Sequence, residues 1–417
     1  MIGVEAERSP AVRERKLTPT LLALAISYPI VAARFGLPEI GSSLTAALLV
    51  GTLVVLVRWR RLRFRRLRLP MVATGIWLVL GMAHSAIWAP DSWSVLLLYP
   101  LTALVALLVG STLSARELAF LIAVSTLVWA FVVVSTIGFS YGASYGSKQD
   151  LNVYGISLNG LASLAALPLM VMVSRLFAGG PRALTGWRWL PGAIGAFVIY
   201  ASASLSVLPA VVFGGCGAVL LASRRRVTRS VAAACAAGVL VAYLWQLRSS
   251  IDLGGGDLRG RDELWHGAVQ LIQAGLPGGI GAEQSYVRGW AFAPHPFGAL
   301  LSGGVHNWAL QLTLAYGLIG LALLATSMLA YVPALRSTLR ARDAVISGAV
   351  SWAVFAVLAR GLVESDGSVV FLRPSSQSFL IWLILGCALS APRWRRPMEE
   401  LVQAERVEIP AFLGSAP

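Results

Sequence analysis

The side chains best suited to acid–base chemistry are few in this sequence, and most of them fall in one segment. The chain of 417 residues has four histidines, and three of these, His266, His295 and His306, lie within residues 248–306. An imidazole titrates close to neutral pH, which makes it the usual general base in proteins. His306 directly precedes Asn307 and a long apolar run. It is therefore either a general base held at the start of a helix or a polar helix-end residue.

Arginine supplies a second kind of chemistry in the same segment. A guanidinium group offers fixed, paired donors that match the oxygens of a phosphate group. Arg259, Arg261 and Arg288 lie in this segment, and Lys148 and Arg360 bring positive charge close to the ends of other apolar runs. Each of the five is a candidate to bind an anionic substrate. Each can equally be an exposed charge or one half of an ion pair.

These residues do not form a pattern typical of a metal site. His266, His295 and His306 lack the spacing of metal ligands, so a zinc site is disfavoured. The three cysteines lie within apolar runs, where they behave as small apolar residues and predict no disulfide framework. We therefore expect neither a bound metal nor another cofactor.

The elements that position these residues are expected to be membrane helices. Hydrophobic residues make up 57% of the chain, charged residues make up 13%, and the mean hydropathy is +0.73. No soluble domain of ordinary composition is so apolar. We predict an all-α, polytopic membrane protein in which residues 1–417 form one integral membrane domain. About twelve apolar runs approach the roughly 20 residues needed to cross a bilayer, at 20–36, 40–57, 70–89, 93–112, 117–138, 158–176, 190–206, 207–223, 230–247, 307–333, 344–364 and 376–391.

The basic residues orient these predicted spans. The formal net charge is +15, and with the N-terminus inside, 26 of the 34 lysines and arginines fall on the cytoplasmic side, as the positive-inside rule requires. We expect both termini in the cytoplasm and the spans in the cytoplasmic membrane. Because the basic residues lie at span ends instead of forming one patch, we expect membrane lipids as partners and not nucleic acid.

Residues 248–306 form the long external loop of this arrangement. Apolar side chains recur in it with helical spacing, which predicts a short amphipathic helix over about 261–274 that lies on the membrane surface. Gly275 and Pro277 suit the end of that helix. The LPGGIG stretch that follows has three glycines, which allow backbone N–H groups to converge on an anion. The simpler interpretation of this stretch is a tight turn.

Four short motifs occur in order across roughly residues 146–333. They are Asn159-Gly160-Leu161-Ala162 entering a span, Gly260-Arg261-Asp262-Glu263-Leu264-Trp265 opening the amphipathic helix, Pro277-Gly278-Gly279-Ile280-Gly281 in the turn, and His306-Asn307 before a span with Gly317 and Gly320. In order, spacing and membrane context they resemble the O-antigen ligase and O-antigen polymerase superfamily of bacterial envelope glycosyltransferases. One family feature is missing, because Ser204-Leu205-Ser206-Val207 stands where family members often carry Ser-Arg-Gly.

The resemblance implies a reaction and a set of site residues. A glycan is moved from an undecaprenyl-diphosphate carrier to a hydroxyl of an acceptor glycan or lipid, outside the bacterial cytoplasmic membrane. The residues that it implies are His306 as general base, Arg259, Arg261, Arg288, Lys148 and Arg360 on the diphosphate, and Asn159 and Asn307 on the substrate or as helix caps. A polysaccharide polymerase of the same superfamily is the alternative reading, as is a non-catalytic transporter or scaffold for lipid-linked glycans.

Overall fold

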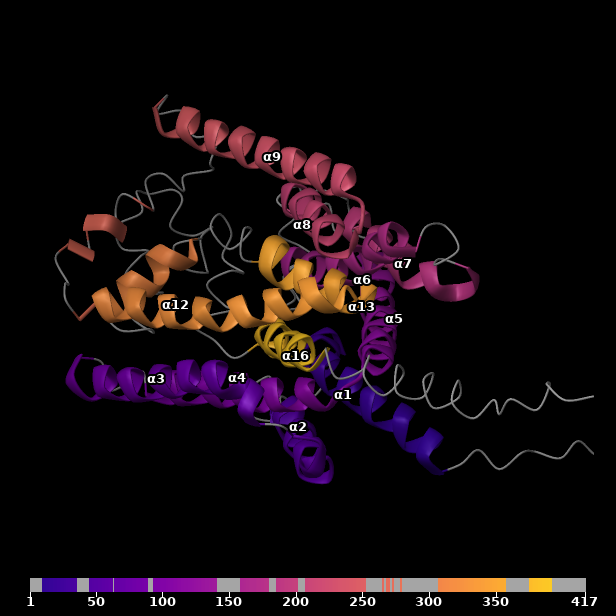
Figure 1. Cartoon of the computed structure of the whole chain (residues 1–417). Coiled ribbons are helices and arrows are strands. Elements are labelled where there is room, and N and C mark those ends of the chain that lie inside the picture. The colour runs from indigo at the N-terminus through magenta and orange to yellow at the C-terminus, as the bar shows by residue number, and fades with distance from the viewer. Residues whose placement is uncertain are drawn as a thin grey trace, which may run out of the picture.

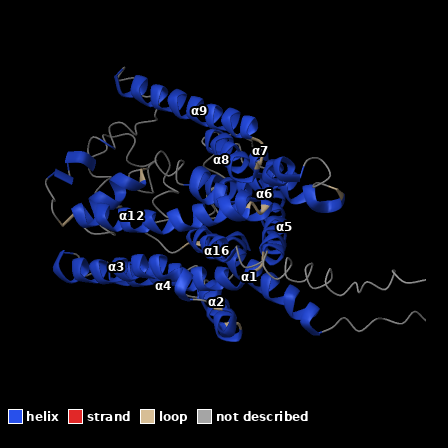
Figure 2. Cartoon of the chain, in the orientation of Figure 1, coloured by secondary structure: helices blue, strands red, loops and turns tan. Residues whose placement is uncertain are grey.

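The computed structural model describes residues 10–35, 45–62, 64–88, 93–140, 158–179, 185–201, 207–252, 307–357 and 375–391, together with residues 265, 268–270, 272–273 and 278–279. Every regular element within these ranges is a helix, and no strand occurs in them (Figure 2). The all-α class predicted from the sequence is therefore confirmed for the described part of the chain.

The α-helices follow the predicted apolar runs. Their bounds are α1 Pro10–Phe35, α2 Thr45–Val57, α3 Phe64–Trp88, α4 Trp93–Thr112, α5 Ala115–Ser140, α6 Leu158–Gly179, α7 Leu190–Ala201, α8 Val207–Ala222, α9 Arg226–Asp252, α12 Trp308–Ala341, α13 Ala344–Ser351 and α16 Ser376–Ser390. A π-helical turn, Trp352–Val357, continues α13. Pro209 stands in the first turn of α8, where a missing backbone N–H removes no helical hydrogen bond.

Three helices contain segments long and apolar enough to cross a membrane. These segments are Leu67–His84 in α3, Ala115–Ser135 in α5 and Gly160–Gly179 in α6. Shorter apolar segments of 10–17 residues lie in α1, α2, α4, α8, α12, α13 and α16. The prediction of apolar membrane-crossing helices is thus supported for three of them. The full set of twelve spans and the cytoplasmic placement of both termini stay predictions.

The centre of the bundle is α16, which is almost entirely buried and packs along α4 (Figure 1). The two backbones touch at a pair of glycines. A Cβ atom on Gly386 would overlap the carbonyl oxygen of Leu107, and one on Gly110 would overlap the carbonyl oxygen of Leu383. Small residues allow this close approach of the two helices, and close approach increases the van der Waals packing between them.

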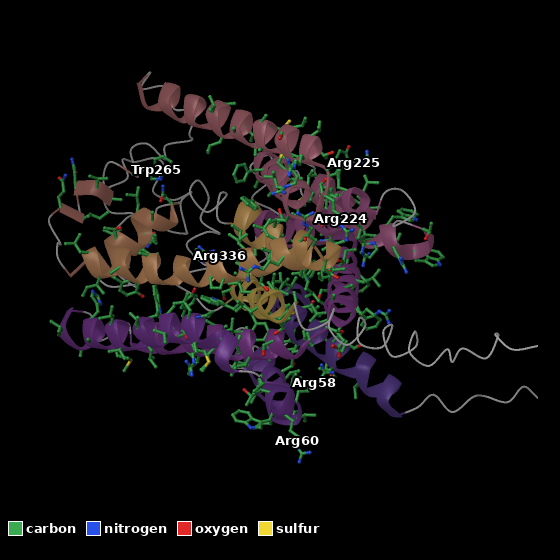
Figure 3. The ribbon with its side chains drawn as sticks, viewed as in Figure 1. Arg58, Arg60, Arg224, Arg225, Trp265 and Arg336 are labelled. Carbon is green, nitrogen blue, oxygen red and sulfur yellow. The ribbon has the colours of Figure 1, made fainter. Side chains whose placement is uncertain are left out.

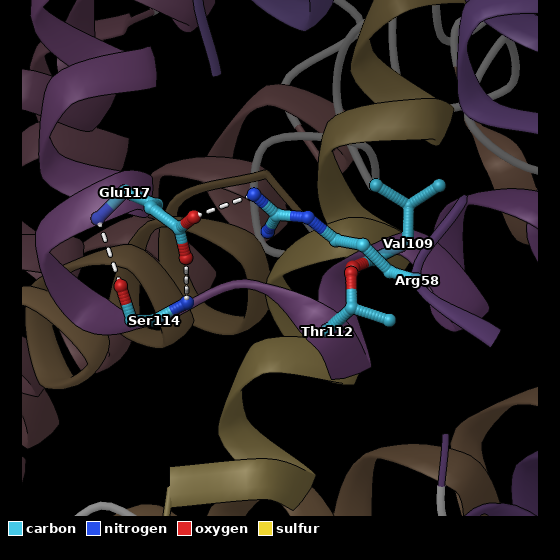
Figure 4. Close-up of polar contacts among 5 residues, drawn as sticks. All are labelled: Arg58, Val109, Thr112, Ser114 and Glu117. Carbon is cyan, nitrogen blue, oxygen red and sulfur yellow. Dashed lines mark hydrogen bonds and ion pairs between the residues drawn. The ribbon is translucent and has the colours of Figure 1, made fainter. Parts of the chain in front are cut away.

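A buried ion pair joins the end of α2 to the start of α5 (Figure 4). Arg58 Nη2 donates to Glu117 Oε1 at 2.8 Å, and the two side chains are only 2% and 9% exposed. The other carboxylate oxygen of Glu117 accepts the backbone N–H of Ser114 at 2.7 Å, while the Ser114 hydroxyl accepts the backbone N–H of Glu117 at 3.3 Å. This reciprocal arrangement caps α5. Arg58 is thus one of the predicted cytoplasmic arginines that has a definite structural role.

The labelled basic residues of Figure 3 do not all lie on one side of the view. Arg58 and Arg60, just after α2, and Arg224 and Arg225, between α8 and α9, lie right of centre, whereas Arg336 of α12 lies on the left half, as Trp265 does. The predicted division into a basic cytoplasmic side and an external side that holds the long loop stays a prediction.

The helix α12 is sharply bent, which corrects the prediction of a single span over 307–333. Gly317 has φ 59° and ψ −143°, a conformation outside the helical region that is open to glycine. Residues 308–316 form a short arm and residues 318–341 a long arm, and the two arms double back at the bend (Figure 1). A Cβ atom on Gly320 would overlap the carbonyl oxygen of Leu312, whereas residues eight apart in a straight helix are separated by about 12 Å.

Candidate functional site

Two of the eight predicted site residues lie in the described part of the chain. Asn159 is the second residue of α6, and Asn307 directly precedes α12. Outside the described residues lie His306, Arg259, Arg261, Arg288, Lys148 and Arg360. Gly281 of the predicted turn and residues 204–206, at the place of the missing family arginine, also fall outside.

Asn307 is the N-cap of α12. Its side-chain oxygen accepts the backbone N–H groups of Ala309 at 3.0 Å and Leu310 at 3.1 Å. Its own carbonyl oxygen accepts the first helical hydrogen bond, from the N–H of Gln311 at 2.8 Å. A side-chain cap of this kind contributes about 1 kcal/mol to helix stability. Capping is one of the two roles that the sequence left open for Asn307. Contact with a substrate stays a prediction.

The Asn-Gly-Leu-Ala motif opens α6 as predicted, and its leucine and alanine are buried. The carbonyl oxygen of Gly160 accepts Nε2 of Gln377, on α16, at 3.5 Å. Just beyond the motif, the carbonyl oxygen of Ser163 accepts Nε1 of Trp352 at 2.7 Å. The start of α6 is therefore held against α16 and against the π-helical turn that follows α13.

The described residues between 265 and 273 are helical, in agreement with the amphipathic helix predicted over about 261–274. Ala268 is 2% exposed and packs with Leu314 of α12, together with Trp265, Ile272 and Leu310. In the part that the structure describes, the apolar stripe packs against the short arm of α12, because that arm presents Leu310 and Leu314 at matching helical spacing. The location of this helix on the membrane surface stays a prediction.

The described residues of the LPGGIG stretch fit into the bend of α12. Gly279 has φ +75°, and a Cβ atom placed on it would lie 2.6 Å from the backbone nitrogen of Gly317 and 2.7 Å from the carbonyl carbon of Ala315. On the preceding residue, the carbonyl oxygen of Gly278 accepts a hydrogen bond from His84 Nε2 of α3. We call this set the turn–bend junction: His84, Gly278, Gly279 and residues 315–317.

Aromatic side chains continue the turn–bend junction into the bundle. The His84 ring stands edge-on to Tyr316, with centroids 5.2 Å apart, and Tyr316 is followed by Trp77 at 6.4 Å. Trp77 lies 5.2 Å from Tyr99, whose hydroxyl oxygen accepts Nε1 of Trp382 at 3.3 Å. These five side chains are at most 2% exposed. Tilted and edge-to-face ring pairs of this kind add stability beyond their buried area, so the junction is attached to a rigid part of the core.

Gly278 lies in a turn and Gly279 has a positive φ, which fits a tight turn, the simpler of the two interpretations of LPGGIG. The close contact of Gly279 with the backbone of α12 was not predicted. His84 lies near the end of α3, and its partner Gly278 lies 194 residues away in the sequence. No spacing rule connects two such positions. The only available signal was that a histidine stands in an otherwise apolar run.

No group of three or more His, Cys, Asp or Glu side chains within the described ranges is arranged to hold a metal ion. His266, His295 and His306 all fall outside those ranges, so the expected absence of a metal stays a prediction. Neither the models of protein families nor the curated proteins compared with the chain give a match. The described part of the chain defines a class: a protein that is all-helical over the residues placed in the structure, with three helices long and apolar enough to cross a membrane.

Proposed function

We propose that the protein is a glycosyltransferase of the bacterial cytoplasmic membrane. It moves a glycan from an undecaprenyl-diphosphate-linked donor to an acceptor hydroxyl on the outer face, as O-antigen ligases do. Four ordered motifs support the reaction, and the apolar helices support the location. On these helices large apolar side chains face outward, such as Val79, 67% exposed, and Phe131, 61% exposed. Lipid suits such a surface better than water does.

The observation that carries the proposal is the convergence of the loop motifs on the short arm of α12. The described residues of the amphipathic segment pack on Leu310 and Leu314, and Gly279 packs on the backbone at the bend. Asn307 caps the opposite end of the same arm and directly follows His306. Nine residues span about 13 Å, less than half the roughly 30 Å of a bilayer core. In membrane proteins such broken helices are tolerated where they are buried or line a cavity.

The proposed reaction needs a base and a stabilised leaving group. The acceptor oxygen forms a bond to the anomeric carbon of the donor glycan, and its proton passes to the imidazole of His306. The bond between the anomeric carbon and the diphosphate oxygen breaks, and its electron pair leaves with undecaprenyl diphosphate. Guanidinium groups at Arg259, Arg261 and Arg288, with Lys148 and Arg360, stabilise the charge that builds on the leaving group. Asn159 and Asn307 position the sugars or the helices that hold them.

Purified protein in lipid nanodiscs, given a defined lipid-linked glycan donor and an acceptor, tests the proposal. His306→Ala is expected to lower kcat by 10²–10⁴-fold, the usual effect of losing a general base. His295→Ala is the matched control, since it removes a histidine of the same segment with no assigned role, and its turnover is expected to stay near the parental value. Parental turnover in His306→Ala would remove this histidine from the mechanism.

The reaction products distinguish the proposed ligase from a polymerase and from a transporter. A ligase attaches the complete glycan to a different acceptor molecule, whereas a polymerase lengthens glycans that stay on the carrier. Movement of intact lipid-linked glycan across the bilayer, with no release of undecaprenyl diphosphate, would replace the proposal with a transporter. In a strain that lacks this protein, an accumulation of full-length glycans on the lipid carrier would indicate a ligase. Shortened surface glycans would indicate a polymerase.

A further inference from the structure

We infer that His84 is a positioning residue of the proposed active site: it docks the external loop on the bend of α12 and thereby fixes the short arm whose start adjoins His306. The catalytic consequence rests on the proposed function. The docking itself rests only on described contacts, so the two can be tested separately.

His84 contacts both partners of the docking with one side chain. Its Nε2–H donates to the carbonyl oxygen of Gly278 in the loop, and its ring makes an edge-to-face contact with Tyr316 in the last turn of the short arm. The side chain is fully buried, so both contacts are shielded from water. A hydrogen bond in such surroundings is strong, and its loss leaves a buried carbonyl without that donor.

The backbone shapes on the two sides of the junction depend on each other. Gly279 approaches Ala315 and Gly317 more closely than any residue with a Cβ atom could. That approach is available only because Gly317 breaks the helix, which opens the backbone just after Tyr316. The loop turn and the bend of α12 therefore form one fitted contact, and His84 is the side chain that holds the turn in it.

The short arm turns a small movement at the junction into a displacement at its start. The arm runs over nine residues, 308–316, which span about 13 Å in an α-helix. A tilt of about 5° at the bend moves the other end by roughly 1 Å. Misplacing a catalytic group by about 1 Å can reduce turnover by about 10²-fold. Loss of docking therefore displaces His306, the residue next to Asn307, although His84 itself does not contact the substrate.

Thiol labelling measures docking without reference to catalysis. In a variant whose native cysteines, Cys216, Cys235 and Cys387, are replaced by serine or alanine, Ala268→Cys places a thiol on the buried face of the amphipathic segment. Val269→Cys, at a residue that is 39% exposed, is the matched control. A membrane-impermeant methanethiosulfonate is expected to label position 268 slowly and position 269 rapidly.

Three substitutions at His84 separate its hydrogen bond from its bulk. A glutamine at position 84 places its amide N–H about where the histidine has Nε2. An asparagine places its amide N–H about where the histidine has Nδ1, and a phenylalanine keeps a ring but has no hydrogen-bond donor. Labelling at position 268 is expected to rise about tenfold in His84→Asn and His84→Phe, the factor for one lost buried hydrogen bond. In His84→Gln the labelling rate at position 268 should stay near the parental value. The labelling rate at position 269 should be unchanged in all three variants.

The same variants are then assayed for glycan transfer. His84→Asn and His84→Phe should lose about 10-fold to 10²-fold in kcat with KM nearly unchanged, because position is affected and substrate contacts are not. His84→Gln should restore most of the activity. Parental labelling at position 268 in all three variants would overturn the docking, and raised labelling with parental kcat would overturn the positioning role. If the parent protein transfers no glycan, the proposed function fails while the labelling still decides the docking.

Discussion

Replacement of Gly317 by alanine tests whether the bend of α12 is built into the sequence. At φ 59° and ψ −143°, an L-residue with a Cβ atom is strained by about 1–3 kcal/mol. The helix can escape this strain only by straightening, which would carry Leu312 away from Gly320 and withdraw Gly317 from Gly279. Either outcome lowers the free energy of unfolding. We expect Gly317→Ala to lower the free energy of unfolding by about 1–3 kcal/mol.

The matched control is Gly238→Ala on α9, where a Cβ atom meets nothing within 4 Å. Alanine in an open helical position is expected to raise stability by about 0.5–1 kcal/mol. The two variants should therefore differ by about 1.5–4 kcal/mol, the sum of these two effects. Denaturant titration in mixed micelles, followed by tryptophan fluorescence, measures the difference. Equal stability of both variants, with parental glycan transfer by Gly317→Ala, would show that the bend is not required.

Three further predictions concern the cap, the buried ion pair and the orientation. Asn307→Ala should lower stability by about 0.5–2 kcal/mol and Asn307→Asp much less, as measured by the same titration; an equal loss from both would exclude capping as the cause. Arg58→Ala leaves the Glu117 carboxylate buried without its cation and should destabilise by about 3–5 kcal/mol, whereas adding Glu117→Ala should restore part of the loss in a double-mutant cycle. Gln284→Cys should react with an impermeant thiol reagent in intact cells, and reaction only after the inner face is opened would reverse the predicted orientation.

The helices could be predicted from the sequence because each depends on local composition. Apolar runs marked their positions, and the polar Asn307 before an apolar run indicated the start of α12. The glycines of LPGGIG predicted a tight turn, and Gly279 has the positive φ that such a turn uses. In each case the causal residues lie within a few positions of the feature that they produce.

The bend and the junction could not be predicted, because their causes are not local. Gly317 lies in an apolar run with other glycines, and nothing in that run distinguishes a bend from a straight helix. The bend is fixed by Gly279 packing into it, 38 residues earlier in the chain. Likewise, Arg58 was counted as one of many basic residues at span ends, whereas Glu117, 59 residues later, makes it a buried partner.

The Arg58–Glu117 pair also has a consequence for the order of assembly during synthesis. Ribosomes add roughly 5–20 residues per second, so Glu117 follows Arg58 after about 3–12 s. Through that interval α3 and α4 are made while the guanidinium still needs water or lipid phosphate around it. The end of α2 can therefore take its final buried position only after the start of α5 has been made. The packing of α2 is complete only when α5, three α-helices later in the chain, supplies the neutralising charge.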